Sequence, residues 1–384
     1  MKLEVTRKDF LKGWQTAERF ADMKSPNNAV KGIFISATED GQVTLKATDL
    51  KTSVKCRAEG VNVLEVGEAV IPVEIFGSMI RKVETDELVI DINSERGFLK
   101  AGKNKMKFAV IPAEQFPNIP SISDSEKVCM VQAELLSQLI AEGGSASSVP
   151  QEFPKYIGTC LFKTGGDSIK IVATDGKRLS LSQRACGTIE ADKELMFPAT
   201  AFKELGKCLA SYKDKEVQVS ASESVAWLAV DDIEFSVRLV DATFPQYERI
   251  LNNVVQASLK AKSSDLTLAL ERIDIIASTT PAHIMVLSLN PNGEIKITAR
   301  SQKVEGIASE EFLAEIDGQP MLIGFNVGYF LDGLKILGNC DVSIEFSGEE
   351  SQARMKRKDS DDFLYMLMPA RLSQQDKITE EEMQ

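Results

Sequence analysis

The chain contains 384 residues, 43% of them hydrophobic and 27% charged, which is the balance of a globular protein with two or three domains. Its formal net charge of −12 excludes a broad basic surface that binds DNA tightly, so any contact with nucleic acid would be local or weak. The sequence has no apolar run of the ~20 residues that a membrane span needs, and its first residues lack the apolar core of a signal peptide.

The first third of the chain predicts helix, strand pair, helix and further strands in that order. Strands are predicted over residues 32–38 and 42–48, joined by the turn-forming pair Asp40-Gly41. A second helix is predicted over 73–84, directly after Pro72, with β-rich sequence behind it. The first helix is predicted from apolar residues that recur at helical spacing near the start of the chain: Phe10, Leu11, Trp14, Ala17 and Phe20.

The second and third parts of the chain predict the same order of elements. In the second part we expect a helix near 132–142, strands at 159–164 and 168–174, and a helix near 199–211. In the third part we expect a helix near 265–278, strands at 284–290 and 294–300, and a helix near 326–337.

Short sequence patterns recur along the chain at intervals of about 126 residues. Ala47 and Ala173 each begin an Ala-Thr-Asp triplet, lie 126 residues apart, and lead after the same interval to Ala299. Repeats of this length are whole domains rather than solenoid units. The sequence therefore predicts an α+β protein with three tandem copies of a two-helix, roughly eight-strand domain. The expected boundaries are 1–122, 127–251 and 253–372, followed by an acidic C-terminal tail at 373–384.

The sequence shows no grouping of residues that would form a catalytic or metal-binding site. His283 is the sole histidine of the sequence, so we interpret it as a polar residue near a strand start rather than as a base or metal ligand. Asp49 and Asp175 each follow a strand, where an aspartate typically caps a turn; the alternative, a metal-binding carboxylate, would need further acids nearby. The six cysteines lie too far apart to suggest a zinc site or a disulfide framework. We therefore expect no catalytic residue, no metal, no cofactor and a reducing, cytoplasmic location.

Five motifs give the chain a resemblance to a known family: ATDL (47–50), FPNIP (116–120), VATDGKRL (172–179), FPQYERIL (244–251) and YMLMPARL (365–372). Along essentially its whole length the chain resembles the bacterial DNA polymerase III beta subunit, the replicative sliding clamp. The resemblance implies a non-catalytic processivity factor, in which two three-domain protomers form a ring with helices inside and sheets outside. Such a ring would encircle double-stranded DNA and slide on it without sequence specificity. Encirclement replaces tight phosphate binding, which reconciles this function with an acidic chain.

The resemblance also implies a pocket between the second and third domains that captures short peptides. The partners would be the replicative DNA polymerase, the clamp loader, and other polymerases and repair proteins that carry clamp-binding peptides, with no membrane partner. Leucine, proline and methionine side chains would bury apolar anchors, and Arg178 and Arg371 would supply polar contacts at the rim. Carried onto this sequence, the pocket comprises Ile157, Thr174, Gly176, Lys177, Arg178, Leu179, Pro245, Ile250, Met366, Met368, Pro369, Ala370, Arg371 and Leu372.

The sequence departs from the family pattern at three places. Ala370 stands where the family often has a second methionine, and Lys177 stands where histidine is common. The family commonly ends near Leu372, whereas this chain continues to residue 384. The tail could fray, pack locally or lie across the pocket, and disorder is the default expectation for such a terminus.

The resemblance places several residues near DNA or at the ring interface. The expected DNA-facing residues are Lys24, Gln151, Lys155 and Tyr156 on loops, and Arg7, Lys8, Lys12, Arg19, Arg81, Lys82, Lys203, Lys207, Arg272 and Lys335 on helices. Whether Glu74, Glu134 and Glu142 face the hole or the outer wall stays open. Ring closure would set Met106 and Phe108 of one protomer against Ile275 and Ile276 of the other, although each could equally belong to a core.

Two alternatives remain at this level. One is a nuclease-like enzyme that uses Asp49 or Asp175, which the shortage of histidines and metal ligands disfavours. The other is a clamp-like peptide-binding protein without stable ring closure.

Overall fold

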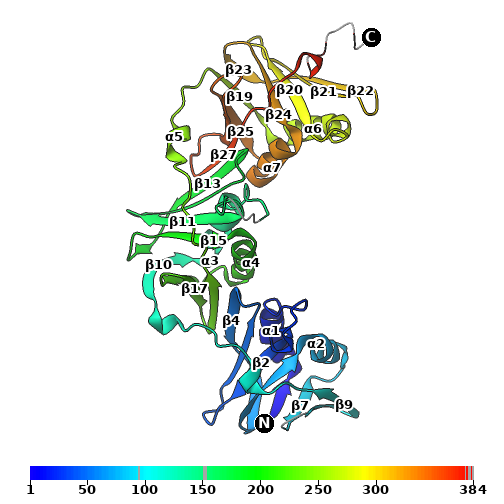
Figure 1. Ribbon diagram of the computed structural model, residues 1–384, viewed down its shortest axis with the longest axis vertical. Helices are drawn as coiled ribbons and strands as arrows, with labels where there is room; N and C mark the ends of the chain where they lie inside the picture. The colour runs from blue at the N-terminus through cyan, green and yellow to red at the C-terminus, as the bar shows by residue number, and fades with distance from the viewer. Residues whose placement is uncertain (94–95, 150–153, 377, 379–381, 383–384) are drawn as a thin grey trace. The chain divides into compact units, whose positions relative to one another are not determined.

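Each third of the chain folds with one order of elements: a strand, a helix, five strands, a second helix and three strands (Figure 1). The computed structural model describes residues 1–384 apart from 94–95, 150–153, 377, 379–381 and 383–384. Within these residues every third has nine strands, one more than the roughly eight predicted from sequence. All strand pairs described are antiparallel, and the predicted α+β class is confirmed.

The elements of the first third are β1 Lys2–Thr6, α1 Arg7–Glu18, β2 Gly32–Ala37, β3 Val43–Thr48, β4 Thr52–Arg57, β5 Val61–Glu65, β6 Gly67–Pro72, α2 Val73–Lys82, β7 Glu87–Ile92, β8 Arg96–Ala101 and β9 Asn104–Ala109. Those of the second are β10 Glu126–Gln132, α3 Ala133–Gly143, β11 Thr159–Gly165, β12 Ser168–Thr174, β13 Arg178–Ala185, β14 Thr188–Ile189, β15 Glu194–Pro198, α4 Ala199–Leu209, β16 Glu216–Ala221, β17 Val225–Val230 and β18 Ile233–Arg238.

The third part follows a short helix that the sequence did not predict, α5 Glu248–Leu251. Its elements are β19 Ala257–Lys262, α6 Ser263–Ala277, β20 Ile284–Leu289, β21 Glu294–Ser301, β22 Gly306–Leu313, β23 Glu315–Gly318, β24 Met321–Asn326, α7 Val327–Leu337, β25 Asp341–Phe346, β26 Ala353–Arg357 and β27 Phe363–Leu367. Single 3₁₀ turns occur at Asn28–Lys31, Ala113–Gln115, Ile122–Asp124, Ala210–Tyr212 and Gln374–Asp376.

The predicted helices form because their apolar residues share one face. In α1, Phe10, Trp14 and Ala17 are fully buried, and the ring centroids of Phe10 and Trp14 lie 6.1 Å apart. Phe20 lies just beyond the helix and packs against Phe235 of β18. Such a stripe at i, i+4 and i+7 buries a helix along one side of a sheet, which is how amphipathic helices gain most of their stability.

The chain divides into two units, each with its own pair of sheets. The first unit comprises residues 1–135, 186–192 and 207–239, and the second comprises 136–185, 193–206 and 240–384. The first unit has a five-stranded sheet, β5-β1-β7-β8-β9, and a nine-stranded sheet, β14-β10-β16-β17-β18-β4-β3-β2-β6. The second has a nine-stranded sheet, β15-β11-β12-β13-β27-β26-β25-β19-β23, and a four-stranded sheet, β22-β21-β20-β24.

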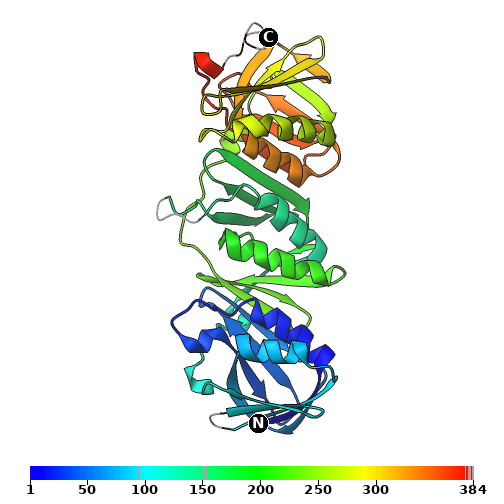
Figure 2. The ribbon, with the colours of Figure 1, turned by 90° about the vertical axis from the view of Figure 1, so that its right-hand side faces the viewer.

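In both nine-stranded sheets, strands from two different thirds of the chain pair directly. In the first unit β18 pairs with β4, and in the second β27 pairs with β13. Helices pack on one face of the sheets: α1 lies against β3 and β4 beside α2, and α6 lies against β21 beside α7 (Figure 2). Side chains on the opposite face of each sheet are therefore available to form binding surfaces.

Candidate functional site

The two Ala-Thr-Asp stretches form turns with the same pattern of hydrogen bonds. After β12, the Thr174 hydroxyl donates to the Arg178 carbonyl at 2.7 Å, and Asp175 Oδ1 accepts from the backbone N–H groups of Lys177 and Arg178 at 2.9 and 3.0 Å. The Gly176 N–H donates to the Thr174 hydroxyl oxygen, and Gly176 has a φ of +85° that a glycine adopts without strain. The prediction that Asp175 caps a turn is confirmed.

The earlier turn repeats this pattern position by position. The Thr48 hydroxyl donates to the Thr52 carbonyl at 2.7 Å, and Asp49 Oδ1 accepts from the N–H groups of Lys51 and Thr52. Leu50, with a φ of +72°, takes the place of the glycine. Asp49 therefore also caps a turn, as predicted, and its Oδ1 is engaged by three donors of its own turn.

Pairing of β13 with β27 brings together two of the sequence-predicted segments, 174–179 and 366–372. Leu179 lies opposite Met366 and Arg178 opposite Leu367. The pairing continues past the end of β27, because the Met368 N–H donates to the Lys177 carbonyl at 2.9 Å. Leu179 and Met366 are buried in one apolar cluster, whereas Met368 is 47% exposed.

The remaining predicted pocket residues lie on the neighbouring connections. Pro245 is exposed just before α5, and Ile250 lies within α5, where its carbonyl accepts from Gln352 Nε2 at 3.1 Å. Ile157 is half-buried in the turn before β11. Tyr247 and Tyr156 belong to the apolar cluster that contains Leu179 and Met366, so these connections share a core with β13 and β27.

The Arg178 side chain is 12% exposed, and its guanidinium contacts neighbouring groups through Nε and Nη1. Its Nε donates to Asp175 Oδ2 at 2.9 Å, and Nη1 donates to Asp332 Oδ2 at 2.5 Å and to the Tyr365 hydroxyl at 3.0 Å. It also lies 4.4 Å from the centroid of the Tyr329 ring. Through these contacts Arg178 links β13 to α7; polar contacts between Arg178 and a bound peptide stay a prediction.

These contacts determine the charge state at this point. Burial by itself would lower the pKa of Arg178, but Tyr365, Asp332 and Asp175 outweigh it and raise that pKa. For the Tyr365 hydroxyl, burial acts in the other direction and raises the pKa. The hydroxyl therefore stays protonated and remains beside the guanidinium. The guanidinium therefore stays charged and fixed in orientation.

A cavity of about 500 Å³ lies beside the C-terminal segment of the pocket. Five predicted residues line it, from Met368 to Leu372, together with three that the sequence reasoning missed, Leu322, Glu349 and Glu350. The Leu322 N–H donates to Glu349 Oε1 at 3.0 Å, which fixes one wall. The Ala370 N–H donates to the Gly324 carbonyl at 2.8 Å and holds the segment against β24. No sequence signal marked these three residues, because Leu322 on β24 and the Glu349-Glu350 pair after β25 come together only in the folded chain.

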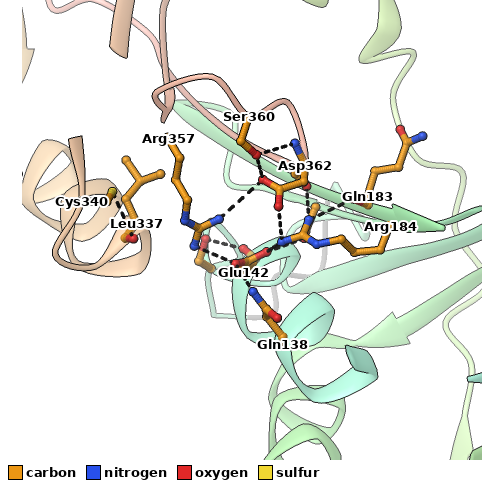
Figure 3. Close-up of polar contacts among 11 residues, drawn as sticks. Gln138, Glu142, Gln183, Arg184, Leu337, Cys340, Arg357, Ser360 and Asp362 are labelled. Atoms are coloured by element: carbon orange, nitrogen blue, oxygen red, sulfur yellow. Dashed lines mark hydrogen bonds and ion pairs between the residues drawn. The ribbon is translucent and has the colours of Figure 1, made fainter. Parts of the chain in front are cut away.

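An ion cluster around the buried Glu142 joins the central third of the chain to the last third (Figure 3). The carboxylate of Glu142, at the end of α3, accepts from Arg184 Nη2 at 3.0 Å and from Arg357 Nη2 at 2.8 Å. Arg184 Nη2 also lies 2.9 Å from Asp362 Oδ2. Glu142 thus belongs to a structural junction, whereas Glu134 is exposed, 3.9 Å from Lys213. Glu74 is exposed in the first turn of α2.

Several residues predicted to face DNA are engaged with carboxylates of their own unit. Arg81 Nη1 contacts both oxygens of Glu18 at 2.8 and 2.9 Å, and Lys12 Nζ lies 3.0 Å from Asp9. Arg7 lies 4.0 Å from Asp86, Arg272 lies 2.6 Å from Glu310, and Arg19 donates to Cys208 Sγ. Lys8, Lys24, Lys82, Lys155, Lys207 and Lys335 are exposed, and Lys203 and Tyr156 are half-buried. Gln151 lies outside the described residues.

The four predicted interface residues differ in exposure. Ile275 on α6 is 69% exposed, whereas Ile276 is half-buried against the C-terminal core. Met106 is half-buried on β9, the edge strand of its sheet. Phe108 is 6% exposed and packs 5.2 Å from Phe76, centroid to centroid, above Gly97, where a Cβ would meet its ring. Phe108 is thus buried in the core of its own protomer, one of the two readings that the sequence left open.

The described residues contain no group of three or more metal-ligating side chains. His283, just before β20, contacts Asp274 of α6, which agrees with its interpretation as a polar residue near a strand start. No helix in the described part of the chain has the length and apolarity to cross a membrane. In the tail, Glu382 forms an ion pair with Arg300 of β21 at 2.6 Å.

Comparison with known proteins assigns all three thirds of the chain to the same family. Residues 1–120, 130–246 and 248–371 match models of the N-terminal, central and C-terminal domains of the DNA polymerase III beta subunit. The beta sliding clamp of Vibrio cholerae is 29% identical over 345 residues, 89% of this chain and 92% of that protein. The beta sliding clamp of Escherichia coli is 28% identical over 97% of this chain and 100% of its own length.

A solved structure extends this likeness to three dimensions. The crystal structure of the DNA polymerase III subunit beta from Pseudomonas aeruginosa superposes with a TM-score of 0.91 at 25% identity, covering 97% of this chain and 100% of that one. The three-domain clamp fold, the nearly complete coverage and the three domain matches agree with one another. The chain therefore belongs to the DNA polymerase III beta subunit family of bacterial sliding clamps.

Proposed function

We propose that the protein is a DNA polymerase processivity factor that acts as a homodimeric ring around duplex DNA and docks partners through a peptide pocket. It has no catalytic step of its own and works in the cytoplasm. Its partners are the replicative polymerase, the clamp loader, and other polymerases and repair proteins with clamp-binding peptides. The three domains are assigned to 1–122, 127–251 and 253–372, with the tail at 373–384.

The observation that carries the peptide pocket is the junction of β13 with β27. The hydrogen bond between Met368 and Lys177 keeps the exposed methionine beside the 174–178 turn, next to a cavity of about 500 Å³. Apolar walls of Met368, Pro369 and Leu372 suit the leucine and phenylalanine anchors of a short linear motif, and methionine adapts to varied shapes. Because Arg178 is engaged with Asp175 and Asp332, its role in this pocket is to hold the walls in position.

Binding of a labelled peptide of the Gln-Leu-x-Leu-Phe type, measured by fluorescence anisotropy, tests the pocket. We expect saturable binding that Met368→Ala weakens by about tenfold, because truncating one of the few residues that dominate an interface costs more than about 1 kcal/mol. Met23→Ala, which truncates an exposed methionine of the first third, is the matched control and should leave binding unchanged. If Met368→Ala and Met23→Ala bind the peptide equally well, the peptide pocket does not lie at this site.

Unpaired sheet edges support ring closure. β9 is the edge of the five-stranded sheet and β22 is the edge of the four-stranded sheet, and exposed edge groups are stabilised by pairing with another chain. Sedimentation analysis should give the mass of a dimer for the wild type, and Ile275→Asp should shift it toward the monomer, whereas Val254→Asp at another exposed apolar position should not. A monomeric wild type that still binds the peptide would favour the alternative, a clamp-like binding protein without ring closure.

The duplex is proposed to run past the helices, as the family resemblance implies. The paired basic residues of the first unit, among them Arg81 and Lys12, predict weak, salt-sensitive contacts in which each single change has a small effect.

A further inference from the structure

The junction of β4 with β18 in the first unit repeats the hydrogen-bonded geometry of the proposed peptide site. The Arg238 N–H donates to the Lys51 carbonyl at 2.8 Å, just as the Met368 N–H donates to the Lys177 carbonyl at 2.9 Å. Both bonds continue a strand pair beyond its last residue, next to an Ala-Thr-Asp turn with the same side-chain caps. The first unit therefore presents the same backbone frame as the proposed site.

The side chains on the two frames differ in charge. Where the second junction has the exposed Met368, the first has the exposed Arg238; the adjacent turn residue is an exposed lysine at both junctions, Lys51 at the first and Lys177 at the second. Leu50, half exposed at the tip of the turn, supplies an apolar contact beside them.

Two cavities lie on this sheet face, on either side of Pro120. One, of about 100 Å³, is lined by Lys51, Leu50 and Arg238 among others; the second, of about 140 Å³, includes Lys46 and Lys55. The carbonyl of Pro120 accepts from Trp227 Nε1 at 3.3 Å, which holds the segment between the cavities in place. We name these two cavities with their four cations the basic cavity pair.

The charge balance of the basic cavity pair is unlike that of the whole chain. Its linings contain four cations and one acid, Glu234, which is neutralised by Lys55 at 2.8 Å. The chain as a whole has a net charge of −12, so a local basic excess is a specific feature of this surface.

The sheet face on which the cavities lie argues against DNA as the occupant. Val43, Leu45 and Ala47 of β3 are buried on the side of the sheet that α1 covers, and Lys46 and Thr48 alternate onto the other side. In the proposed ring the helices face the duplex, so this surface faces away from it; this one step rests on the proposed function. Cavities of this size also suit single side chains rather than a phosphate backbone.

We propose that the basic cavity pair is a second docking site, which takes an extended acidic peptide segment of a partner protein. Carboxylates of the segment pair with Lys51 and Arg238 on one side of Pro120 and with Lys46 on the other, and a small apolar side chain packs against Leu50. The two junctions of one protomer thus select partners of different chemistry, apolar at the second and acidic at the first.

The test uses two labelled peptides in anisotropy titrations of the full-length protein. The first is Ser-Asp-Glu-Leu-Asp-Glu-Leu-Ser, and its neutral counterpart has Asn and Gln in place of Asp and Glu. The second is the Gln-Leu-x-Leu-Phe peptide. We expect the acidic peptide to bind and the neutral one not to, with binding weakened at least about fivefold in Lys51→Gln/Arg238→Gln, because two charge pairs are lost. The matched control, Lys262→Gln/Lys358→Gln, removes the same charge from exposed positions at the end of β19 and just after β26 and should leave binding unchanged.

The outcomes separate this proposal from the proposed function. Met368→Ala should weaken the Gln-Leu-x-Leu-Phe peptide and leave the acidic peptide unaffected. If both double variants weaken acidic-peptide binding equally, the binding is general charge attraction. If Met368→Ala abolishes acidic-peptide binding, the peptide binds at the other junction. Either result overturns the second site. Absence of acidic-peptide binding overturns it too, as does a duplex DNA affinity that falls in Lys51→Gln/Arg238→Gln alone. Failure of the Gln-Leu-x-Leu-Phe peptide to bind the wild type would contradict the proposed function without affecting this result.

Discussion

Arg178 of β13 and Asp332 of α7, 154 residues apart in sequence, form an ion pair of 2.5 Å that joins the 174–179 segment of the peptide site to α7. The same guanidinium reaches Asp175 through Nε, so its planar fork spans two carboxylates in different directions. An ammonium group is a point charge on a flexible stem and cannot reproduce this geometry.

Arg178→Lys should therefore destabilise the second unit although it keeps the positive charge. We expect the melting temperature measured by calorimetry to fall by about 2–6 °C, because one directed contact is lost and a buried carboxylate is left poorly paired. Arg249→Lys, at an exposed position of α5, is the control and should melt with the wild type. A variant Arg178→Lys that melts at the wild-type temperature would show that the fork is dispensable.

Glu142 is expected to matter far more than the other acid of the same helix. Replacing it in Glu142→Gln leaves Arg184 and Arg357 with Asp362 as their remaining carboxylate, in a site where Glu142 itself is 6% exposed (Figure 3). Breaking a buried charge cluster typically costs about 3–5 kcal/mol. Denaturant titration should show this loss for Glu142→Gln and almost none for Glu134→Gln, whose partner Lys213 is exposed. Similar midpoints for the two variants would contradict the structural role of the cluster.

The buried thiol of Cys160 should make the folded protein less stable at alkaline pH. Burial raises the pKa of its thiol from 9.0 to about 12. Between these values the folded protein retains a proton that the unfolded chain releases, so the contribution is complete below pH 9 and falls as the pH rises toward 12. The slope is at most about 1.4 kcal/mol per pH unit.

Cys160→Ala should flatten this dependence in unfolding curves recorded from about pH 8 to 10.5. The absolute stability of the variant also changes because the side chain is smaller, but the slope isolates the titration. Cys340→Ala removes a half-buried thiol and should flatten the curve less. An unchanged slope in Cys160→Ala would mean that other groups control the alkaline limb.

Ala370 lines the cavity of about 500 Å³, and a larger side chain there should bury more of a bound peptide. Ala370→Met adds apolar atoms, each buried methylene contributing about 0.8 kcal/mol. We expect the Gln-Leu-x-Leu-Phe peptide to bind about three- to tenfold more tightly by anisotropy. Ala282→Met at an exposed position before β20 serves as control, and a weaker or equal affinity in Ala370→Met would show that the cavity is not part of the peptide contact.

The sequence by itself determined those features of this protein that depend on neighbouring residues or on a regular spacing of residues. The six long helices start and end within a few residues of their predicted bounds, because apolar spacing and the preceding strand ends lie within one window of sequence. The turns at Asp49 and Asp175 were predictable for the same reason, since each aspartate caps backbone groups two or three residues away. Five short motifs, among them those at 172–179 and 365–372, together with three domains of equal length, gave the resemblance to the family.

Only the tertiary structure decided how these segments meet. Glu142 and Arg357 are 215 residues apart, and no local pattern relates them. Phe108 is a core residue because Gly97 on the paired strand leaves room for its ring, and Arg178 links β13 to α7 because the fold brings Asp332 to it. Likewise Arg238 and Lys51 form a basic surface only after β18 pairs with β4. Charge and burial at such points depend on chain segments far away in sequence, so they follow from packing and not from spacing.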